Sequence, residues 1–129
     1  MYPKNLKYTE THEWVEVDKD TATVGITNFA TKQLTDLVYV ELPSMRAKVA
    51  KGSSFGVVES VKAVSDLHSP VSGTVVKVNE KLSKEPEIVT QDPYGKGWMI
   101  KVKIEDRTDL DALLDSEEYE ELVKKEKKQ

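Results

Sequence analysis

Lys62 is the residue whose type and position most clearly suggest chemistry in this sequence. It lies ten residues after Gly52 and eleven before Gly73. The β-branched segments 55–61 and 71–78 on either side predict two strands. Residues 61–63 lie between them without the Asn-Gly or Asp-Gly pair that most often marks a hairpin turn. We therefore expect Lys62 at the tip of a hairpin, although a solubility role is the commoner interpretation of a single exposed lysine.

The two histidines are the other side chains that often perform chemistry. His12 and His68 are far apart in the sequence, and the chain contains no cysteine, which excludes disulfides, cysteine nucleophiles and cysteine-based zinc sites. His68 is close to Asp66 and Ser69, but neighbours on a strand point to alternate faces and rarely form a Ser-His-Asp triad. We interpret both histidines as ordinary surface or packing residues. With no nucleotide loop or paired carboxylate site in view, the pattern favours a protein that is not an enzyme.

The composition describes one domain rather than several. The chain has 129 residues, of which 38% are hydrophobic and 33% charged, and no apolar run approaches the ~20 residues that a membrane helix needs. A formal net charge of −4 disfavours nucleic acid as a partner, since nucleic acid attracts clustered lysine and arginine. The beginning of the chain lacks the apolar core of a signal peptide. We expect a cytoplasmic protein with protein partners, the alternative being a mature protein of the mitochondrial matrix.

Alternating apolar and polar residues predict further strands around the hairpin, at residues 14–18, 21–26, 37–42 and 98–104. A short helix capped by Thr27 or Asn28 should run to Leu34. Thr108 should open a helical region, and Ser116 is a good N-cap for a second helix. Residues 49–52 and 70–73, which enter the two predicted arms, resemble each other weakly, which is compatible with two similar halves forming a flattened barrel.

Six short motifs, in sequence order from about Leu6 to Tyr119, resemble the glycine cleavage H-protein family of lipoyl carriers. They cover nearly the whole chain, and together they are specific although each alone is weak. The motifs are His12-Glu13-Trp14, Ala22-Thr-Val-Gly-Ile-Thr27, Val40-Glu-Leu-Pro43, Glu59-Ser-Val-Lys62-Ala63, Ser69-Pro-Val-Ser-Gly73 and Asp92-Pro-Tyr-Gly-Lys-Gly-Trp98.

The resemblance implies a mostly β fold, the barrel-sandwich hybrid of lipoyl and biotinyl domains, with a short helix in the N-terminal half and helices near the C-terminus. Residues 1–129 would form a single lipoyl-carrier domain, with a core at about 6–105 and a helical region at about 108–125. Lys62 would be the site of covalent lipoyl attachment. Biotin is the chemical rival at such a lysine, but biotinyl carriers usually flank it with methionines, whereas Val61 and Ala63 stand here.

The resemblance also implies partners. The carrier would shuttle an aminomethyl group and reducing equivalents between a pyridoxal phosphate-dependent glycine decarboxylase, a folate-dependent aminomethyltransferase and dihydrolipoyl dehydrogenase. A lipoate ligase or octanoyltransferase would attach the arm. Two alternatives remain open at this point: a lipoyl relay that supplies 2-oxoacid dehydrogenase complexes, and a protein-interaction module of the same fold that is never modified.

Two carboxylates are candidates for holding the aminomethyl cargo. An amine on this group that loses its proton can expel the thiolate, so a carboxylate that keeps it as an ammonium would protect the cargo. Glu13, within the first motif, and Asp66, four residues after Lys62, are the candidates. The equally weighted alternative makes Glu13 an exposed strand charge and Asp66 a turn residue. Thr35 stands where the family commonly has glycine, which marks the local turn as a departure from the family pattern.

Overall fold

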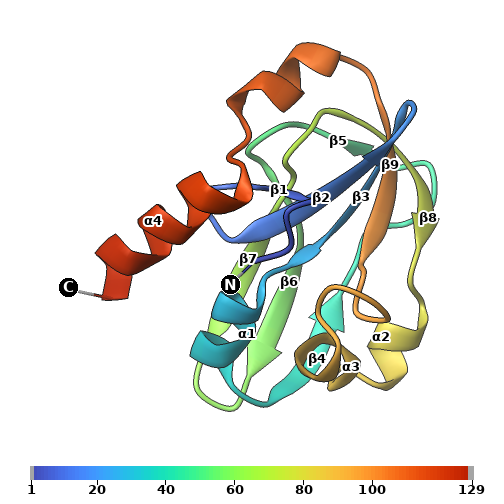
Figure 1. Ribbon diagram of the computed structural model, residues 1–129. Coiled ribbons are helices and arrows are strands. Elements are labelled where there is room, and N and C mark those ends of the chain that lie inside the picture. Colours follow the sequence, from blue (N-terminus) through green and yellow to red (C-terminus); the bar gives the residue numbers. More distant parts are fainter. Residues whose placement is uncertain (1, 128–129) are drawn as a thin grey trace.

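The computed structural model describes residues 2–127 and arranges them as two antiparallel sheets with short helices at their ends (Figure 1). Within these residues the larger sheet has six strands in the order β1-β2-β3-β9-β8-β5. Their bounds are Lys7–Tyr8 (β1), Glu13–Asp18 (β2), Thr21–Ile26 (β3), Lys48–Val49 (β5), Gly73–Val78 (β8) and Ile100–Ile104 (β9). The smaller sheet has the order β4-β6-β7. Its strands are Leu37–Glu41 (β4), Ser54–Ser60 (β6) and Val64–His68 (β7).

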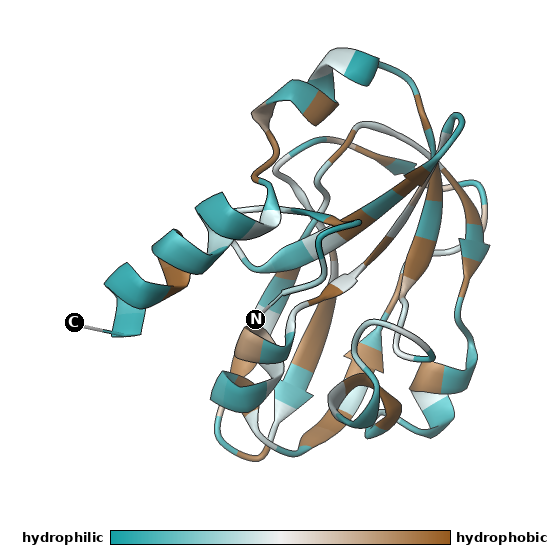
Figure 2. Cartoon of the chain, viewed as in Figure 1, coloured by the Kyte–Doolittle hydropathy of each residue, from teal (hydrophilic) through white to brown (hydrophobic). Residues whose placement is uncertain are grey.

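The main core lies between the two sheets. Alternate residues of each strand point inward, so the buried side chains of β3 and β9 meet those of the smaller sheet. Figure 2 shows the resulting mixture of hydrophobic and hydrophilic residues along the strands. The fold is the predicted barrel-sandwich hybrid, and it is mostly β. Buried residues that represent both sheets are Val24, Val58, Leu67, Val75 and Val102.

A second, aromatic cluster attaches the C-terminal helix α4 (Ser116–Lys127) to β1. The rings of Tyr8 and Tyr119 stack with centroids 4.7 Å apart, and both side chains are fully buried. The Tyr119 hydroxyl lies 2.7 Å from Thr27 Oγ1 and 2.7 Å from His12 Nδ1. Burying two tyrosines with satisfied hydroxyls gives α4 a defined position on the sheet although most of its surface is exposed.

The helices are short. Besides α4 they are α1 (Asn28–Leu34), α2 (Lys81–Lys84), α3 (Ile88–Gln91) and a 3-10 helix at Arg107–Ala112. The predicted cap at Thr27 is confirmed, since its side chain accepts a hydrogen bond from Ala30 N. The predicted start of the last helix at Ser116 is confirmed, but the cap is Asp115: its Oδ1 accepts from Glu118 N while Glu118 Oε1 accepts from Asp115 N, a reciprocal capping box. In the described part of the chain, no helix has the length and apolarity needed to cross a membrane.

The strand that follows Lys62 was predicted incorrectly. The partner of β6 is β7, Val64–His68, whereas the predicted segment 71–78 becomes β8 of the other sheet, where it pairs with β9 and β5. In β7 only Leu67 is fully buried. Most of its other side chains are exposed or half-buried, and three of the five residues are Ser65, Asp66 and His68. The segment therefore lacks the run of β-branched residues that predicts a strand. The short strands β1 and β5 and the helix α3 were also not predicted.

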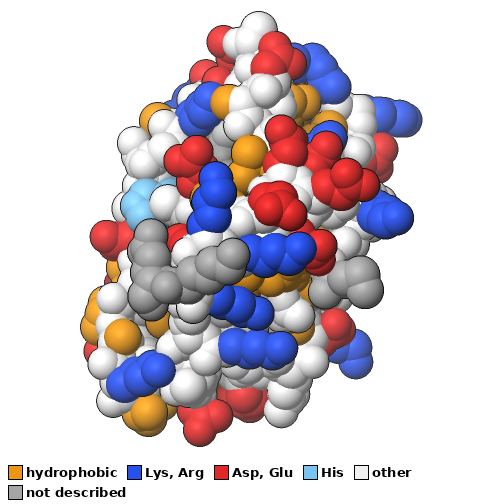
Figure 3. Space-filling view, turned by 60° about the vertical axis from the view of Figure 1, so that its left-hand side comes forward, with side chains coloured by type: hydrophobic (Ala, Val, Ile, Leu, Met, Phe, Trp, Pro, Cys, Tyr) orange, Lys and Arg blue, Asp and Glu red, His pale blue; other side chains and the backbone are white. Residues whose placement is uncertain are grey.

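The surface carries both signs of charge. Figure 3 shows acidic and basic side chains across one face of the molecule, in keeping with 23 acidic and 19 basic residues in the sequence. The ends of the predicted domain, residues 1 and 128–129, lie outside the described residues.

Candidate functional site

Lys62 lies at the tip of the β6–β7 hairpin, as predicted. Glu59 pairs with Val64 in the last register position, so residues 61–63 form the turn. Positive φ angles among residues 2–127 occur elsewhere, so this turn does not use the left-handed backbone that an Asn-Gly pair would supply. The side chain of Lys62 is exposed.

Ser60 holds the turn together in place of a glycine turn. Its buried hydroxyl accepts hydrogen bonds from Lys62 N at 3.2 Å and Ala63 N at 3.0 Å. Its backbone N–H donates to Ala63 O at 2.8 Å. One side chain therefore satisfies both amides on either side of the Lys62 side chain, which fixes the backbone while the amine stays in solvent.

Exposed apolar side chains flank Lys62 in the turn and occur on the neighbouring strand. Val61 is 74% exposed and Val64 is 65% exposed, and Val38 and Tyr39 on the neighbouring strand β4 are also exposed. Their unusual exposure leaves an apolar rim beside an accessible nucleophile. Lys62 therefore lies on a small, accessible tip.

Glu13 lies at the start of β2 and is buried, with 1% exposure. Its Oε1 accepts hydrogen bonds from the hydroxyls of Thr9, at 2.6 Å, and Thr11. Its Oε2 accepts from the backbone N–H of His68 at 3.0 Å. Burial raises the pKa of Glu13, and the three hydrogen bonds oppose that rise. The alternative of an exposed strand charge is wrong, because the turn at residues 9–12 folds back and covers the carboxylate.

Asp66 lies in the middle of β7, opposite Val57, and is exposed. Its alternative as a turn residue is therefore also wrong. Asp66 and His68 are two residues apart on one strand, so their side chains point to the same face. Glu13 belongs to the other sheet, but its carboxylate accepts a hydrogen bond from the backbone of His68 at the end of β7. Both candidate carboxylates therefore lie at β7.

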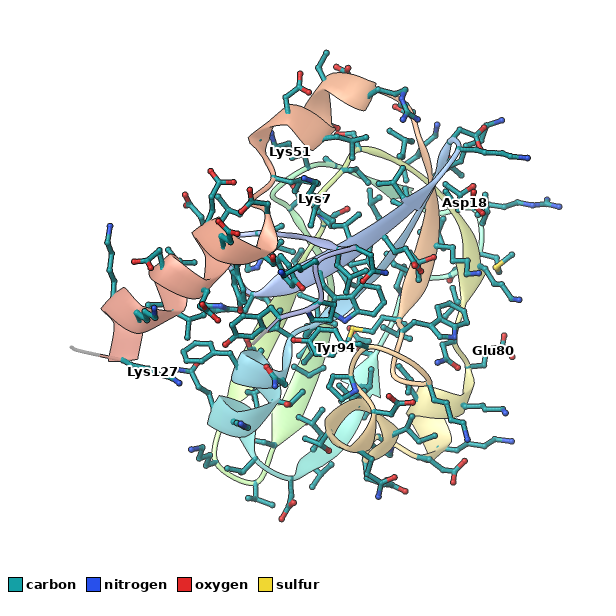
Figure 4. All side chains as sticks on the ribbon, in the orientation of Figure 1. Lys7, Asp18, Lys51, Glu80, Tyr94 and Lys127 are labelled. Carbon is teal, nitrogen blue, oxygen red and sulfur yellow. The ribbon has the colours of Figure 1, made fainter. Side chains whose placement is uncertain are left out.

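A cavity of ≈ 340 Å³ opens at the base of the hairpin; Thr9, Thr11 and His68, which bind Glu13, line it, but Glu13 itself does not. Lys51, which lines this cavity, is labelled in Figure 4. It lies at the opposite end of the molecule from the β6–β7 turn seen in Figure 1. The lining combines hydroxyl, imidazole and apolar groups, including Thr9, Thr11, Lys51, His68, Pro70 and Leu113.

Thr9, Thr11 and His68 are the site residues that sequence reasoning missed. The spacing of Thr9 and Thr11 gave no usable signal, because residues 9–12 form a turn and the alternation of an extended chain does not apply to them. No local signal relates His68 to Glu13, since the two are 55 residues apart.

The other histidine has a packing role, as predicted. His12 Nε2 lies 2.8 Å from Glu126 Oε2, and its Nδ1 lies 2.7 Å from the Tyr119 hydroxyl, so the ring links α4 to the sheet. Within residues 2–127, no three or more acidic or histidine side chains are grouped in a way that could hold a metal ion. The chemically usable groups are thus an exposed amine at one end of the hairpin and a buried carboxylate at the other.

Comparisons with known proteins agree with this arrangement. The model of the family "Glycine cleavage H-protein" matches residues 6–126. A glycine cleavage system H protein from Carboxydothermus hydrogenoformans is 55% identical over 126 residues, covering 98% of this chain and 97% of the relative. One from Marinobacter nauticus is 57% identical over 122 residues, covering 94% of each chain. The crystal structure of a glycine cleavage system H protein from Mycobacterium marinum has a TM-score of 0.82 at 38% identity, covering 92% of this chain and 95% of that one.

Proposed function

Because the chain belongs to the glycine cleavage H-protein family, we propose that it carries lipoate as an amide on Lys62. The family function is that of the lipoyl carrier in glycine cleavage, and this is the function of the chain. The family is one of carriers, and we propose that the protein itself catalyses no step. The predicted cytoplasmic location stays a prediction.

The observation that supports Lys62 most directly is its presentation. A carrier lysine must be accessible to the attaching enzyme, while the backbone beneath it stays fixed, and the Ser60 hydroxyl provides that fixed turn. The exposed aliphatic rim and the small Ala63 leave room for an acyl group. Bound lipoate would supply a dithiolane for thiol–disulfide exchange, chemistry that a chain without cysteine does not have.

The proposed partners follow from membership in the glycine cleavage system. They are the pyridoxal phosphate-dependent glycine decarboxylase, the folate-dependent aminomethyltransferase and dihydrolipoyl dehydrogenase, together with a lipoate ligase or octanoyltransferase. A tethered group has a high effective concentration at each partner that docks, which favours one carrier serving several enzymes in turn. We further propose that residues 1–129 act as one carrier domain, with a core at about 6–105.

Glu13 and Asp66 are proposed to hold the aminomethyl cargo by accepting hydrogen bonds from its ammonium. A carboxylate stabilises the protonated amine, and the three residues that bind Glu13 also line the cavity. Asp66 follows Lys62 by four residues, a distance of about 13 Å along an extended chain. His68 follows Lys62 by six residues, a distance of about 20 Å. Asp66 is therefore the nearer group, and Glu13 is the more buried one.

The attachment is tested by intact mass after incubation with lipoate, ATP and a lipoate ligase. We expect one lipoyl increment in the natural chain and none in Lys62→Arg. Lys84→Arg, at an exposed lysine of α2, is the matched control and should keep the increment. No increment in the folded natural chain would instead support the unmodified interaction module, and an increment in Lys62→Arg would place the attachment elsewhere.

The holding role is tested on protein loaded with glycine and the decarboxylase. Glu13→Ala should speed the breakdown of the loaded adduct without blocking lipoylation, and formaldehyde release reports the rate. An unchanged decay rate would remove Glu13 from this role. Membership in the glycine cleavage family does not favour the relay alternative, which a transfer assay to 2-oxoacid dehydrogenase complexes separates.

A further inference from the structure

The Glu13 carboxylate has one acceptor position left over. A carboxylate offers about four such positions. Oε1 takes the hydroxyls of Thr9 and Thr11, and Oε2 takes the backbone N–H of His68. One position on Oε2 therefore has no donor from these hydrogen bonds, although the side chain is buried.

A ring nitrogen of His68 lies close to Glu13 Oε2 and has no hydrogen-bond partner within residues 2–127. His68 Nδ1 lies 3.9 Å from Glu13 Oε2. Among the described residues it is one of the two buried side-chain nitrogen or oxygen atoms that lack a hydrogen-bond partner. Glu13 Oε2 already accepts from His68 N but has a position left, and His68 Nδ1 lies just beyond hydrogen-bond distance of it. Contacts of this kind are often long in the empty state of a site.

The other ionisable groups around the pair are few. The cavity wall adds Lys51 and Glu10, and β7 adds Asp66 on the same face as His68. Only the histidine combines a ring nitrogen within 4 Å of the carboxylate with a backbone N–H that already binds it. His68 is therefore the group best placed to control the state of Glu13.

We infer that His68 is a positioning residue: in the unloaded protein its Nδ1–H donates to the free position on Glu13 Oε2 and holds Glu13 as a carboxylate. The role deepens the proposed function, on which it rests, because only an ionised Glu13 attracts an ammonium. Burial alone favours the protonated acid, which cannot attract it. A hydrogen bond from the imidazole ring favours the ionised carboxylate and so opposes the effect of burial.

The test is a carbon-13 NMR titration of the Glu13 carboxyl in the full chain without lipoate. His68→Leu removes both ring nitrogens, and His68→Gln places its amide nitrogen at the level of Nε2 rather than Nδ1. Both should raise the pKa of Glu13 by about one unit, since hydrogen bonding to the charged form lowers it. His68→Asn places its amide nitrogen as many bonds from Cα as Nδ1 is, so it should leave Glu13 close to its natural titration.

A natural titration in His68→Leu and His68→Gln, or an Asn variant that behaves like Leu, would overturn the inference. Unchanged amide spectra outside β7 and the start of β2 show that a variant is folded. If His68→Leu does not fold, His68→Gln replaces it in the test. The exposed Glu16 on β2 is the internal reference. This readout does not depend on Lys62, so its failure is distinct from a failure of lipoylation.

The loaded protein gives a second readout. His68→Leu should shorten the adduct lifetime several-fold, and His68→Asn should leave it unchanged. An unchanged lifetime despite a shifted Glu13 titration would support the positioning of Glu13 by His68. It would also remove Glu13 from holding the cargo, so the two proposals are separated.

Discussion

The two ends of the β6–β7 hairpin differ in how their key residues are held. At the tip, Lys62 is exposed and only its backbone is fixed, through Ser60. At the base, Glu13 is buried and every hydrogen bond it accepts comes from a separate part of the chain or from a tight turn. The Lys62 amine is accessible to other molecules, whereas the Glu13 carboxylate is fixed by hydrogen bonds from Thr9, Thr11 and His68.

Backbone strain occurs near both ends of the hairpin. Thr35 ends α1 with φ 64° and ψ −137°, a backbone region that suits glycine. Two residues later Leu37 pairs with Ser60, next to the hairpin turn. Thr35, where the family commonly has glycine, thus carries a backbone cost close to the tip, and His12, directly before Glu13, has a positive φ of 75° at the base.

The largest expected effect is at the base. Glu13→Gln should lower the free energy of unfolding by about 2–3 kcal/mol at pH 7, because an amide has one acceptor oxygen where the two carboxylate oxygens accept three charge-assisted hydrogen bonds. Asp66→Asn, at the exposed carboxylate, should change it by no more than about 0.5 kcal/mol. Urea denaturation of both variants measures the contrast, and equal effects would break the distinction between the two carboxylates.

The next effect is at the tip. Ser60→Ala removes the acceptor for the amides of Lys62 and Ala63, and should cost about 1.5 kcal/mol of unfolding free energy. Ser65→Ala is the matched control, because the Ser65 hydroxyl makes only one long contact, to Asp66 O at 3.4 Å. Hydrogen exchange of the turn amides should increase in Ser60→Ala alone. A protected turn in that variant would show that the strands, rather than Ser60, hold the tip.

A smaller change of opposite sign is expected at Thr35. Thr35→Gly should raise the free energy of unfolding by about 1 kcal/mol, since relief of strain exceeds the entropy that glycine adds to the unfolded chain. Thr35→Ala keeps the Cβ atom, so it should bring no gain. Thermal and urea unfolding compare the three proteins. A gain in Thr35→Ala equal to that in Thr35→Gly would mean that the side chain, rather than the backbone, is the source of the cost.

The smallest expected effect is a slope in the pH dependence of stability. Burial raises the pKa of Glu13 above its ordinary value of 4.5, so the folded state binds this proton more tightly than the unfolded state. The contribution of Glu13 is fully present below the unfolded-state pKa and is lost as pH rises through the folded-state pKa. The unfolding free energy of the natural chain, minus that of Glu13→Gln, should fall from about pH 4.5 upward and then level off. A difference that rises with pH would contradict the raised pKa.

Local signals in the sequence were sufficient for the elements that depend on neighbouring residues. The turn position of Lys62, the helix α1 with its Thr27 cap and the strands β2 and β3 are confirmed, because capping and alternation act within a few residues. The same motifs identified the family, which the comparisons confirm.

Only the tertiary structure decided which strand pairs with β6 and whether Glu13 is exposed. The pairing of β6 with β7 rests on a strand whose sequence is polar, and the Ser116 helix is capped one residue earlier than its composition indicated. The burial of Glu13 depends on a hydrogen bond to His68, which is 55 residues away. Sequence periodicity reports which face of an element is apolar, but not which distant backbone amide will meet a carboxylate. That contact forms only when the two sheets pack together.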